Sequence, residues 1–223
     1  MKRLKAGTLL LLLTCVQVIW AQSPKTDARE VAARIDARYN SMKSLRADFT
    51  EIYSGAGVRR SESGTLWIKK PGKMRWEYAS PEKKIFVTDG ATAWFYVPGE
   101  RQARRTSLKK LDDLRSPLRY LLGRSKLEKE LRGLSLAPDV HPETAGDVVL
   151  RGIPAGMEER ISQVLLESDG QGFLRRIVME ELDGSRTEFR LENQQENIAA
   201  SDAAFSFQPP AGVEVLQSDQ LQP

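Results

Sequence analysis

Residues 69–81 read KKPGKMRWEYASP, and this stretch decides the fold. Pro71 and Gly72 are a turn signal, and after them bulky residues alternate with charged ones. Strict alternation predicts a β-strand with one apolar face and one solvated face. Because Met74, Trp76 and Tyr78 share the apolar face, the strand must pack that face against something large.

The same alternation recurs along most of the chain, between turn signals such as Asp89-Gly90 and Asp183-Gly184. Strands are expected at about residues 45–53, 58–70, 73–79, 84–88, 92–97, 101–106, 134–138, 147–151, 161–167, 173–181 and 186–193. Short connections between them predict antiparallel neighbours. A meander of about eleven strands must curl, either into a closed barrel or into an open half-barrel that needs a cover.

Two segments have helical periodicity and could supply that cover. Residues 24–44 are predicted to form an amphipathic helix, with Ser23 as its N-cap. Leucines recur at helical spacing in residues 107–132, which we interpret as inserted lid helices. Residues 194–223 are expected to be a loop-like tail anchored by its phenylalanines and prolines. The fold class is therefore mainly β with an α-helical lid (α+β).

The N-terminus has the pattern of a secretory signal peptide, with a basic start, an apolar run and a small residue at Ala21. We expect cleavage of residues 1–21, which leaves residues 22–223 as one secreted domain. Cleavage removes three of the 34 basic residues and none of the 30 acidic ones, so the mature net charge is +1. Such a balance gives no indication of a nucleic-acid partner.

The single cysteine, Cys15, lies inside this apolar run. After cleavage at Ala21 the mature chain has no thiol, so it relies on its apolar core without disulfides. An alternative interpretation is a lipoprotein signal, in which Cys15 becomes the acylated first residue. Thr14 is larger than the residue usual at that place, and the apolar run continues beyond Cys15, so cleavage at Ala21 is favoured.

The residues offer little raw material for catalysis. The one histidine, His141, falls in a predicted loop, and a lone loop histidine is more often solvated than catalytic. Without a mature cysteine or a second histidine, neither zinc ligation nor Cys-His catalysis is indicated. No Gly-x-Ser-x-Gly elbow is present. We expect a protein that is not an enzyme and that needs no cofactor or metal.

Two other groups of residues invite a binding role. A basic cluster at Arg101, Arg104 and Arg105 is either a solvated face or a contact for an anionic partner. The aromatic face of residues 74–78 is either the core of a closed barrel or the wall of a pocket for long apolar ligands. Trp94 and Tyr96 share parity two strands later, and the sequence leaves open whether they point to the same face. Aromatic rings and a thioether suit such ligands because they give broad dispersion contact without requiring polar partners.

Several strings of the sequence resemble the LolA family of periplasmic lipoprotein carriers. The matching strings are LRADFT (45–50), GTLWIKKP (64–71), MRWEY (74–78), VTDG (87–90), WFY (94–96), SPL (116–118) and FSFQPPAGV (205–213). The resemblance spans nearly all of the mature chain. It implies an unclosed antiparallel half-barrel of eleven strands covered by helices.

The resemblance also implies partners. Family members take acylated lipoproteins from an inner-membrane ABC transporter, shield the acyl chains and deliver them to the outer-membrane receptor LolB. The carrier meets membrane proteins only transiently and catalyses no reaction, and we expect a monomer. By the same resemblance, the residues that line the acyl-chain cavity are Ile35, Tyr39, Met42, Phe49, Met74, Trp76, Trp94, Leu118, Leu121 and Leu122.

One position departs from the family pattern. An arginine that holds the lid closed in the family, through hydrogen bonds to lid carbonyls, is replaced here by Lys70. We expect Lys70 to keep the latch role but to close the lid less firmly, because lysine lacks the planar fork of donors that arginine has. Met74, where relatives have phenylalanine, keeps an apolar contact.

Three other interpretations remain open from the sequence. The same fold could serve a regulator that senses lipids or lipoproteins, or a membrane-anchored receptor like LolB if Cys15 were acylated. A hydrolase ranks last, because the sequence shows no pairing of a nucleophile with a base.

Overall fold

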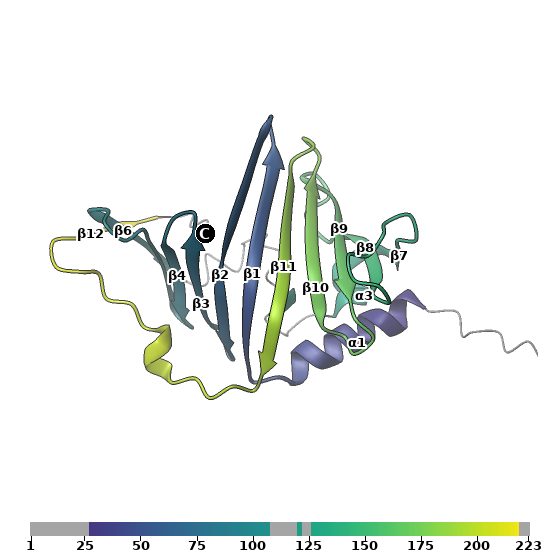
Figure 1. Cartoon of the computed structure of the whole chain (residues 1–223), viewed down its shortest axis with the longest axis horizontal. Coiled ribbons are helices and arrows are strands. Elements are labelled where there is room, and N and C mark those ends of the chain that lie inside the picture. Colours follow the sequence, from purple (N-terminus) through teal and green to yellow (C-terminus); the bar gives the residue numbers. More distant parts are fainter. Residues whose placement is uncertain (1–26, 108–119, 122–125, 219–223) are drawn as a thin grey trace, which may run out of the picture.

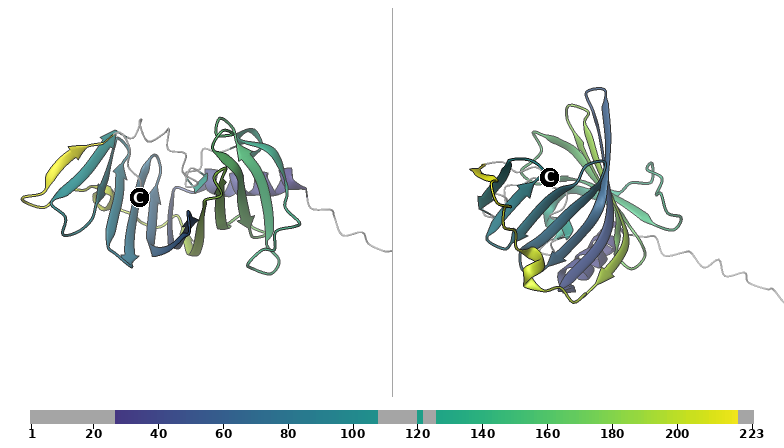
Figure 2. Two further views of the ribbon diagram at one scale, coloured as in Figure 1. Left: turned by 90° about the horizontal axis from the view of Figure 1, so that it is seen from above. Right: turned by 60° about the vertical axis from the view of Figure 1, so that its left-hand side comes forward.

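Twelve strands of the described chain form one curled, open sheet (Figures 1 and 2). The structure is a computed structural model, and it describes residues 27–107, 120–121 and 126–218. The signal peptide predicted at residues 1–21, and with it Cys15, lies outside these residues.

The N-terminal half of the sheet consists of β1 (Ser44–Gly55), β2 (Val58–Lys69), β3 (Lys73–Ser80), β4 (Lys84–Asp89), β5 (Thr92–Tyr96) and β6 (Gln102–Ser107). The C-terminal half consists of β7 (Leu131–Leu136), β8 (Val148–Pro154), β9 (Ile161–Ser168), β10 (Leu174–Glu181), β11 (Arg186–Glu196) and β12 (Glu214–Gln217). The described helices are α1 (Ala28–Ser41), the short α3 (Leu127–Glu130) and the 3-10 turn η2 (Asp202–Phe205).

The strand order is β12-β6-β5-β4-β3-β2-β1-β11-β10-β9-β8-β7, so β12 and β7 are the free edges. The predicted antiparallel half-barrel is confirmed. The described sheet has one strand more than the eleven that were listed from the sequence, because the tail contributes β12, which pairs with β6 in parallel. The description of residues 194–223 as a loop was therefore wrong. A four-residue strand that pairs with a distant edge carries no alternation of its own to recognise.

The alternation of β3 becomes the two faces of the sheet. Trp76 lies opposite Leu66 on β2 and opposite Phe86 on β4, so all three side chains share one face. The strand pairing places Phe49 on β1 and Ile177 on β10 on the same face. We call it the inner face, and its buried side chains form the main core cluster of the described residues. The opposite face is called the outer face.

Helix α1 lies below β9 and β10 in Figure 1 and covers one end of the curled sheet. It begins at Ala28, with the Asp27 side chain accepting from the Arg29 N–H at 3.0 Å, and it ends at Ser41. The predicted span of 24–44 was too long at its C-terminal end, and the predicted Ser23 cap lies outside the described residues. Gly172, with a φ of +88°, lets the β9–β10 turn reach α1, because a Cβ there would lie 2.7 Å from the Arg34 carbonyl oxygen.

The predicted lid helices at 107–132 lie largely outside the described residues. Within that range Ser107 ends β6, Tyr120 and Leu121 are buried, and α3 spans four residues. Leu131 already begins β7, so the predicted helical segment extends too far at its C-terminal end.

The C-terminal segment crosses the outer face of β3–β5. The Asp202 carboxylate pairs with Lys69 at 2.7 Å and with Lys73 at 2.9 Å, and these two lysines lower its pKa to about 2. Phe205 is buried, as η2 packs against β3 and β4. The ring of Phe207 lies 5.5 Å from the rings of both Trp94 and Tyr96. The predicted anchoring of the tail by its phenylalanines is confirmed.

Candidate functional site: the inner face of the sheet

The inner face is a continuous apolar surface that extends from α1 across the sheet. It combines residues of every strand from β1 to β5 and from β7 to β11 with residues of α1 and with Tyr120 and Leu121. Phe49, Leu66, Trp76 and Ile177 form its centre, and Trp76 has no exposed surface. Large apolar side chains on so many strands give dispersion contact over a wide area.

Aromatic rings at the centre of the inner face meet edge to face. The ring of Phe49 lies 4.6 Å from that of Trp76 and 4.9 Å from that of Tyr78. The ring of Phe189 lies 5.8 Å from Trp76 on the other side. The buried indole N–H of Trp76 donates to the Met74 sulfur, so it needs no other polar partner. Phe49, Met74 and Trp76 therefore lie together on the inner face, and their contact with acyl chains stays a prediction.

Trp94 does not belong to this surface, and its assignment to the cavity lining was wrong. Trp94 lies opposite Val87, whereas the inward-pointing residue of β4 is its neighbour Phe86. Adjacent residues of a strand point to opposite faces, so the Trp94 ring points to the outer face. There it contacts Phe207 and lies 5.6 Å below the Arg105 guanidinium. Tyr96 has the same parity and the same neighbour. On this strand the inner face is occupied by Ala93 and Phe95 instead.

The predicted cavity residues of α1 and of its C-cap, Met42, are all buried against the sheet. Ile35, Tyr39 and Met42 are buried in the main cluster. Tyr39 also has a structural role, since its hydroxyl donates to Gln194 Oε1 at 2.9 Å and accepts from the Leu174 N–H at 3.1 Å. Burial raises the pKa of this phenol, which stays protonated. Tyr39 thereby fixes α1 to β10 and β11.

Only one of the three predicted lid leucines is described. Leu121 has no exposed surface and belongs to the same cluster as Trp76. Leu118 and Leu122 lie outside the described residues.

Lys70, the predicted latch, bonds to α1. Its Nζ donates to the carbonyl oxygen of Tyr39, in the last turn of the helix. Carbonyls in that turn lack an intrahelical partner, and a cation is favourable at the negative end of the helix dipole. Burial lowers the pKa of Lys70. The Lys70 bond thus joins the β2–β3 turn to α1. The predicted bond to carbonyls of the inserted helices concerns a segment that lies largely outside the described residues, and it stays a prediction.

The three predicted partner-contact arginines do not form one patch. Arg104 lies opposite Phe95 and so has the parity of the inner face, whereas Arg105 lies opposite Trp94 and has the parity of the outer face. Arg101 precedes β6 in a loop. Adjacent strand residues point in opposite directions, so a run of basic residues in a strand divides its charge between two faces.

A row of polar side chains at one end of the inner face was missed by the sequence analysis. The Tyr78 hydroxyl donates to Glu51 Oε2 at 2.9 Å, and Lys84 Nζ donates to the two carboxylate oxygens of Glu62 at 2.8 and 2.6 Å. Lys84 Nζ also lies 4.4 Å above the Tyr78 ring. The signal was available, because Glu51 shares parity with Phe49, and Tyr78 shares parity with Trp76.

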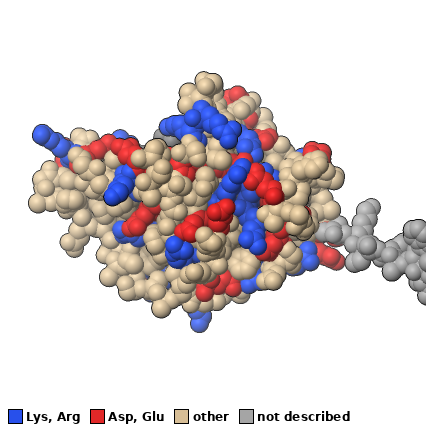
Figure 3. All heavy atoms as spheres, viewed as in Figure 1, with Lys and Arg blue, Asp and Glu red and all other residues tan. Residues whose placement is uncertain are grey.

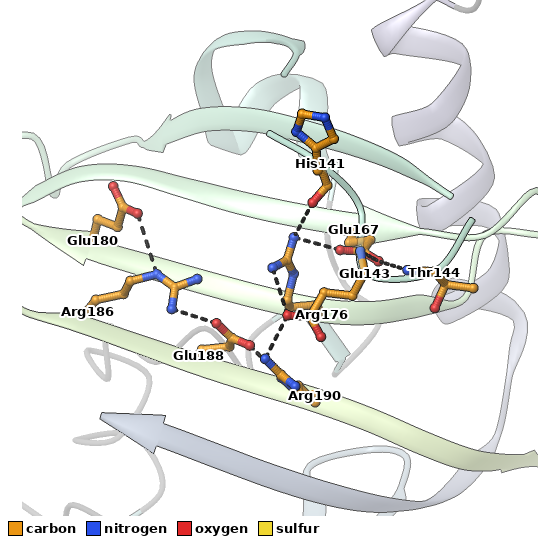
Figure 4. A network of polar contacts seen from close by, with 9 residues as sticks. All are labelled: His141, Glu143, Thr144, Glu167, Arg176, Glu180, Arg186, Glu188 and Arg190. Carbon is orange, nitrogen blue, oxygen red and sulfur yellow. Dashed lines mark hydrogen bonds and ion pairs between the residues drawn. The ribbon is translucent and has the colours of Figure 1, made fainter. Parts of the chain in front are cut away.

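The outer face of β9–β11 differs from the inner face, because acidic and basic side chains are interspersed on it (Figure 3). Figure 4 shows the ion-pair network there. Arg176 pairs with Glu167 at 2.8 Å and with Glu143 at 3.3 Å, and Glu143 also accepts from Arg190 at 2.7 Å. Glu188 lies between Arg190 and Arg186, 2.6 Å from each.

This network holds the β7–β8 loop on the sheet. Glu167 Oε1 accepts from the backbone N–H groups of Glu143 and Thr144, at 2.9 and 3.2 Å. Arg176 donates to the His141 carbonyl oxygen at 3.3 Å. In Figure 4 the His141 imidazole points away from the network. The contact that the structure gives His141 in the network is through its backbone.

The described part of the chain offers neither a cluster of metal-ligating residues nor a membrane-spanning helix. No group of three or more histidine, cysteine, aspartate or glutamate residues within it could hold a metal ion. No helix within it is long and apolar enough to cross a membrane.

The fold and the inner face define a class of protein, namely an open half-barrel whose concave side is apolar. The family model described as "Outer membrane lipoprotein carrier protein LolA" matches residues 40–208. The chain therefore belongs to the LolA family.

Curated relatives agree with this assignment. An outer-membrane lipoprotein carrier protein of Serratia proteamaculans is 29% identical over 187 residues, covering 82% of this chain and 86% of its own length. One of Cronobacter sakazakii is 28% identical over 218 residues, covering 96% and 97%. Among solved structures, an uncharacterised conserved protein from Thermus thermophilus has the same fold, with a TM-score of 0.56 at 13% identity, covering 86% of this chain and 99% of that one.

Proposed function

We propose that this protein is a periplasmic carrier that shields the acyl chains of lipoproteins on their way to the outer membrane. The observation that carries the proposal is the apolar inner face, which extends without a break from α1 across most of the strands. Curated relatives that cover nearly the whole chain are named as carriers of outer-membrane lipoproteins, which supports the same function. In this role the protein binds and releases its cargo and catalyses no reaction.

The energetics of acyl chains favour a covered surface that can open. Each buried methylene contributes about 0.8 kcal/mol, so three chains in a rigid apolar chamber would bind too tightly to be released. Ile35, Trp76 and Leu121 have no exposed surface here. An acyl chain can reach such side chains only after their cover has moved, and the free energy of that movement opposes binding.

The proposed carrier function implies particular partners and a particular compartment. Cleavage after Ala21 would release the mature protein into the periplasm. An inner-membrane ABC transporter would supply acylated lipoproteins, and an outer-membrane receptor equivalent to LolB would accept them. A diacylated Cys15, found by mass measurement of the N-terminus in the native host, would contradict a soluble carrier.

Release of lipoproteins from spheroplasts tests this function directly. Purified protein lacking residues 1–21 is incubated with spheroplasts that have pulse-labelled lipoproteins in the inner membrane. We expect labelled lipoproteins to appear in the supernatant in complex with the protein, because the inner face shields their acyl chains. A supernatant no richer in lipoproteins than one with albumin would contradict the proposed function.

The Lys70 bond to α1 yields a prediction about opening. Lys70→Met removes the charge-assisted hydrogen bond to the Tyr39 carbonyl, worth about 1.5–3 kcal/mol, while keeping the length of the side chain. If α1 is part of the moving cover, the open population rises about tenfold or more, because 1.4 kcal/mol corresponds to a factor of ten. Fluorescence of a dye that binds exposed apolar surface should rise accordingly.

Lys70→Arg should act in the opposite direction, because the guanidinium offers several donors in a fixed plane. We expect lower dye fluorescence and slower transfer of cargo to an acceptor. Lys83→Met, at an exposed position between β3 and β4, is the matched control and should change neither. If both Lys70 variants open and release like the unmodified protein, Lys70 is not a latch.

A further inference from the structure

The inner face is polar at the end nearest the β1–β2 turn. Moving along β1 from Phe49 towards that turn, the next inward residue is Glu51, which lies opposite Glu62 on β2. On β3 the residue after Trp76 on the same face is Tyr78, which lies opposite Lys84 on β4. These four residues, Glu51, Glu62, Tyr78 and Lys84, are called the polar row. The row begins where the ring of Phe49 contacts the ring of Tyr78.

The polar row is shielded from water. The side chains of Lys84 and Glu62 are only 13% and 22% exposed, and Tyr78 is buried. Desolvation raises the pKa of Glu51 above its ordinary value. Placing charges in such a position costs free energy that their pairing repays only in part, and an apolar pair of the same size would be at least as stabilising. Stability alone therefore gives no reason for a lysine and two glutamates on this face.

The row also retains unused hydrogen-bonding capacity. A lysine ammonium has three donors and a carboxylate has about four acceptor sites, of which the described bonds use only some. Lys84 and Glu51 lie on strands separated by β2 and β3, so their free donors and acceptors are spread across the face. A ligand that fits them must carry carbonyl acceptors and N–H donors next to apolar chains.

We propose that the polar row binds the uncharged junction of an acylated ligand, the ester and amide groups that join fatty chains to a cysteine. Lys84 donates to ester carbonyls, Glu51 accepts from the amide N–H, and Tyr78 positions the Glu51 carboxylate. The fatty chains then extend from Phe49 towards Trp76 and α1. This inference rests on the proposed carrier function and adds to it the orientation of the cargo.

The test compares two ligands and two forms of the protein. The first ligand is a synthetic triacylated cysteinyl peptide, and the second is its analogue with ether links in place of the esters, which keeps the chains and lacks the ester carbonyls. Glu62→Gln/Lys84→Gln replaces the ion pair together, so that no charge is left unpaired. Glu77→Gln/Lys83→Gln, at outward or exposed positions of β3 and the β3–β4 turn, is the matched control.

We expect the unmodified protein and the control to bind the ester ligand about tenfold more tightly than the ether analogue, as suits a charge-assisted hydrogen bond. Glu62→Gln/Lys84→Gln should lose that preference while its affinity for the ether analogue stays the same. Tyr78→Phe should weaken binding of the ester ligand by a smaller factor. A preference that persists in the double variant, or is absent from the unmodified protein, overturns the inference. Failure of the unmodified protein to bind either ligand overturns the carrier function itself.

Discussion

Replacing Arg176 by methionine is expected to lower the free energy of unfolding by about 3–5 kcal/mol, the usual cost of removing one partner of a buried ion pair. Arg176 is 8% exposed and Glu167 is 1% exposed. Without the guanidinium the Glu167 carboxylate would remain buried with only two backbone N–H groups as partners. Urea denaturation, followed by circular dichroism at pH 7, measures the loss as a lower midpoint.

A double variant separates the charge from the packing. Arg176→Met/Glu167→Gln removes both charges, while the glutamine oxygen can still accept from the Glu143 and Thr144 N–H groups. We expect this variant to recover about half of the lost stability or more. Arg186→Met is the matched control, because Glu188 keeps Arg190 as a partner, and it should cost about 1 kcal/mol or less. If Arg176→Met costs no more than Arg186→Met, the network does not hold the β7–β8 loop.

Most strands, β12 excepted, could be predicted from the sequence because turn signals bound them and many carry their own alternation. In β3 the side chains of Met74, Trp76 and Tyr78 are buried at every second position, as the pattern required. The inner face could be predicted wherever the apolar residues of one strand lie opposite those of the next, as Trp76 lies opposite Leu66. The alternation of apolar and polar residues within one strand can be recognised without knowing which strand it pairs with.

The face of Trp94 could not be predicted in the same way. Whether Trp94 or Phe95 points inward depends on the register across the Asp89–Ala91 turn, and a shift of one residue reverses every side chain of the strand. An aromatic side chain at this position can be buried on either face, because on the outer face Phe207 of the C-terminal segment covers it. The missing information was the return of a segment more than a hundred residues later in the chain.

The polar row and the outer network were missed for a related reason. Glu51 and Lys84 look like ordinary surface residues in a strand pattern, because burial depends on the curl of the whole sheet. Arg176 and Glu143 are 33 residues apart in the chain and meet because the β7–β8 loop lies against β10. The sequence predicts which strand face is apolar, and the fold decides which charges are enclosed.

Trp76→Ala and Trp94→Ala are expected to differ in their effects on stability and on ligand affinity, because the two tryptophans lie on opposite faces of the sheet. Trp76 is fully buried between Phe49 and Phe189, so its removal should cost about 3–5 kcal/mol of stability. It should also weaken binding of a triacylated peptide, because an acyl chain on the inner face loses its largest contact. Trp94 is half-buried under the C-terminal segment, so Trp94→Ala should cost less stability and leave that affinity unchanged.

Affinity and stability are measured on the same samples, at a temperature where circular dichroism shows both variants folded. Trp76→Phe keeps an aromatic ring and should lie between Trp76→Ala and the unmodified protein in both measurements. The two tryptophans belong to one sheet and to neighbouring hairpins, so a general loosening of the protein would affect both variants alike. Equal losses of ligand affinity in Trp76→Ala and Trp94→Ala would therefore show that acyl chains do not lie on the inner face.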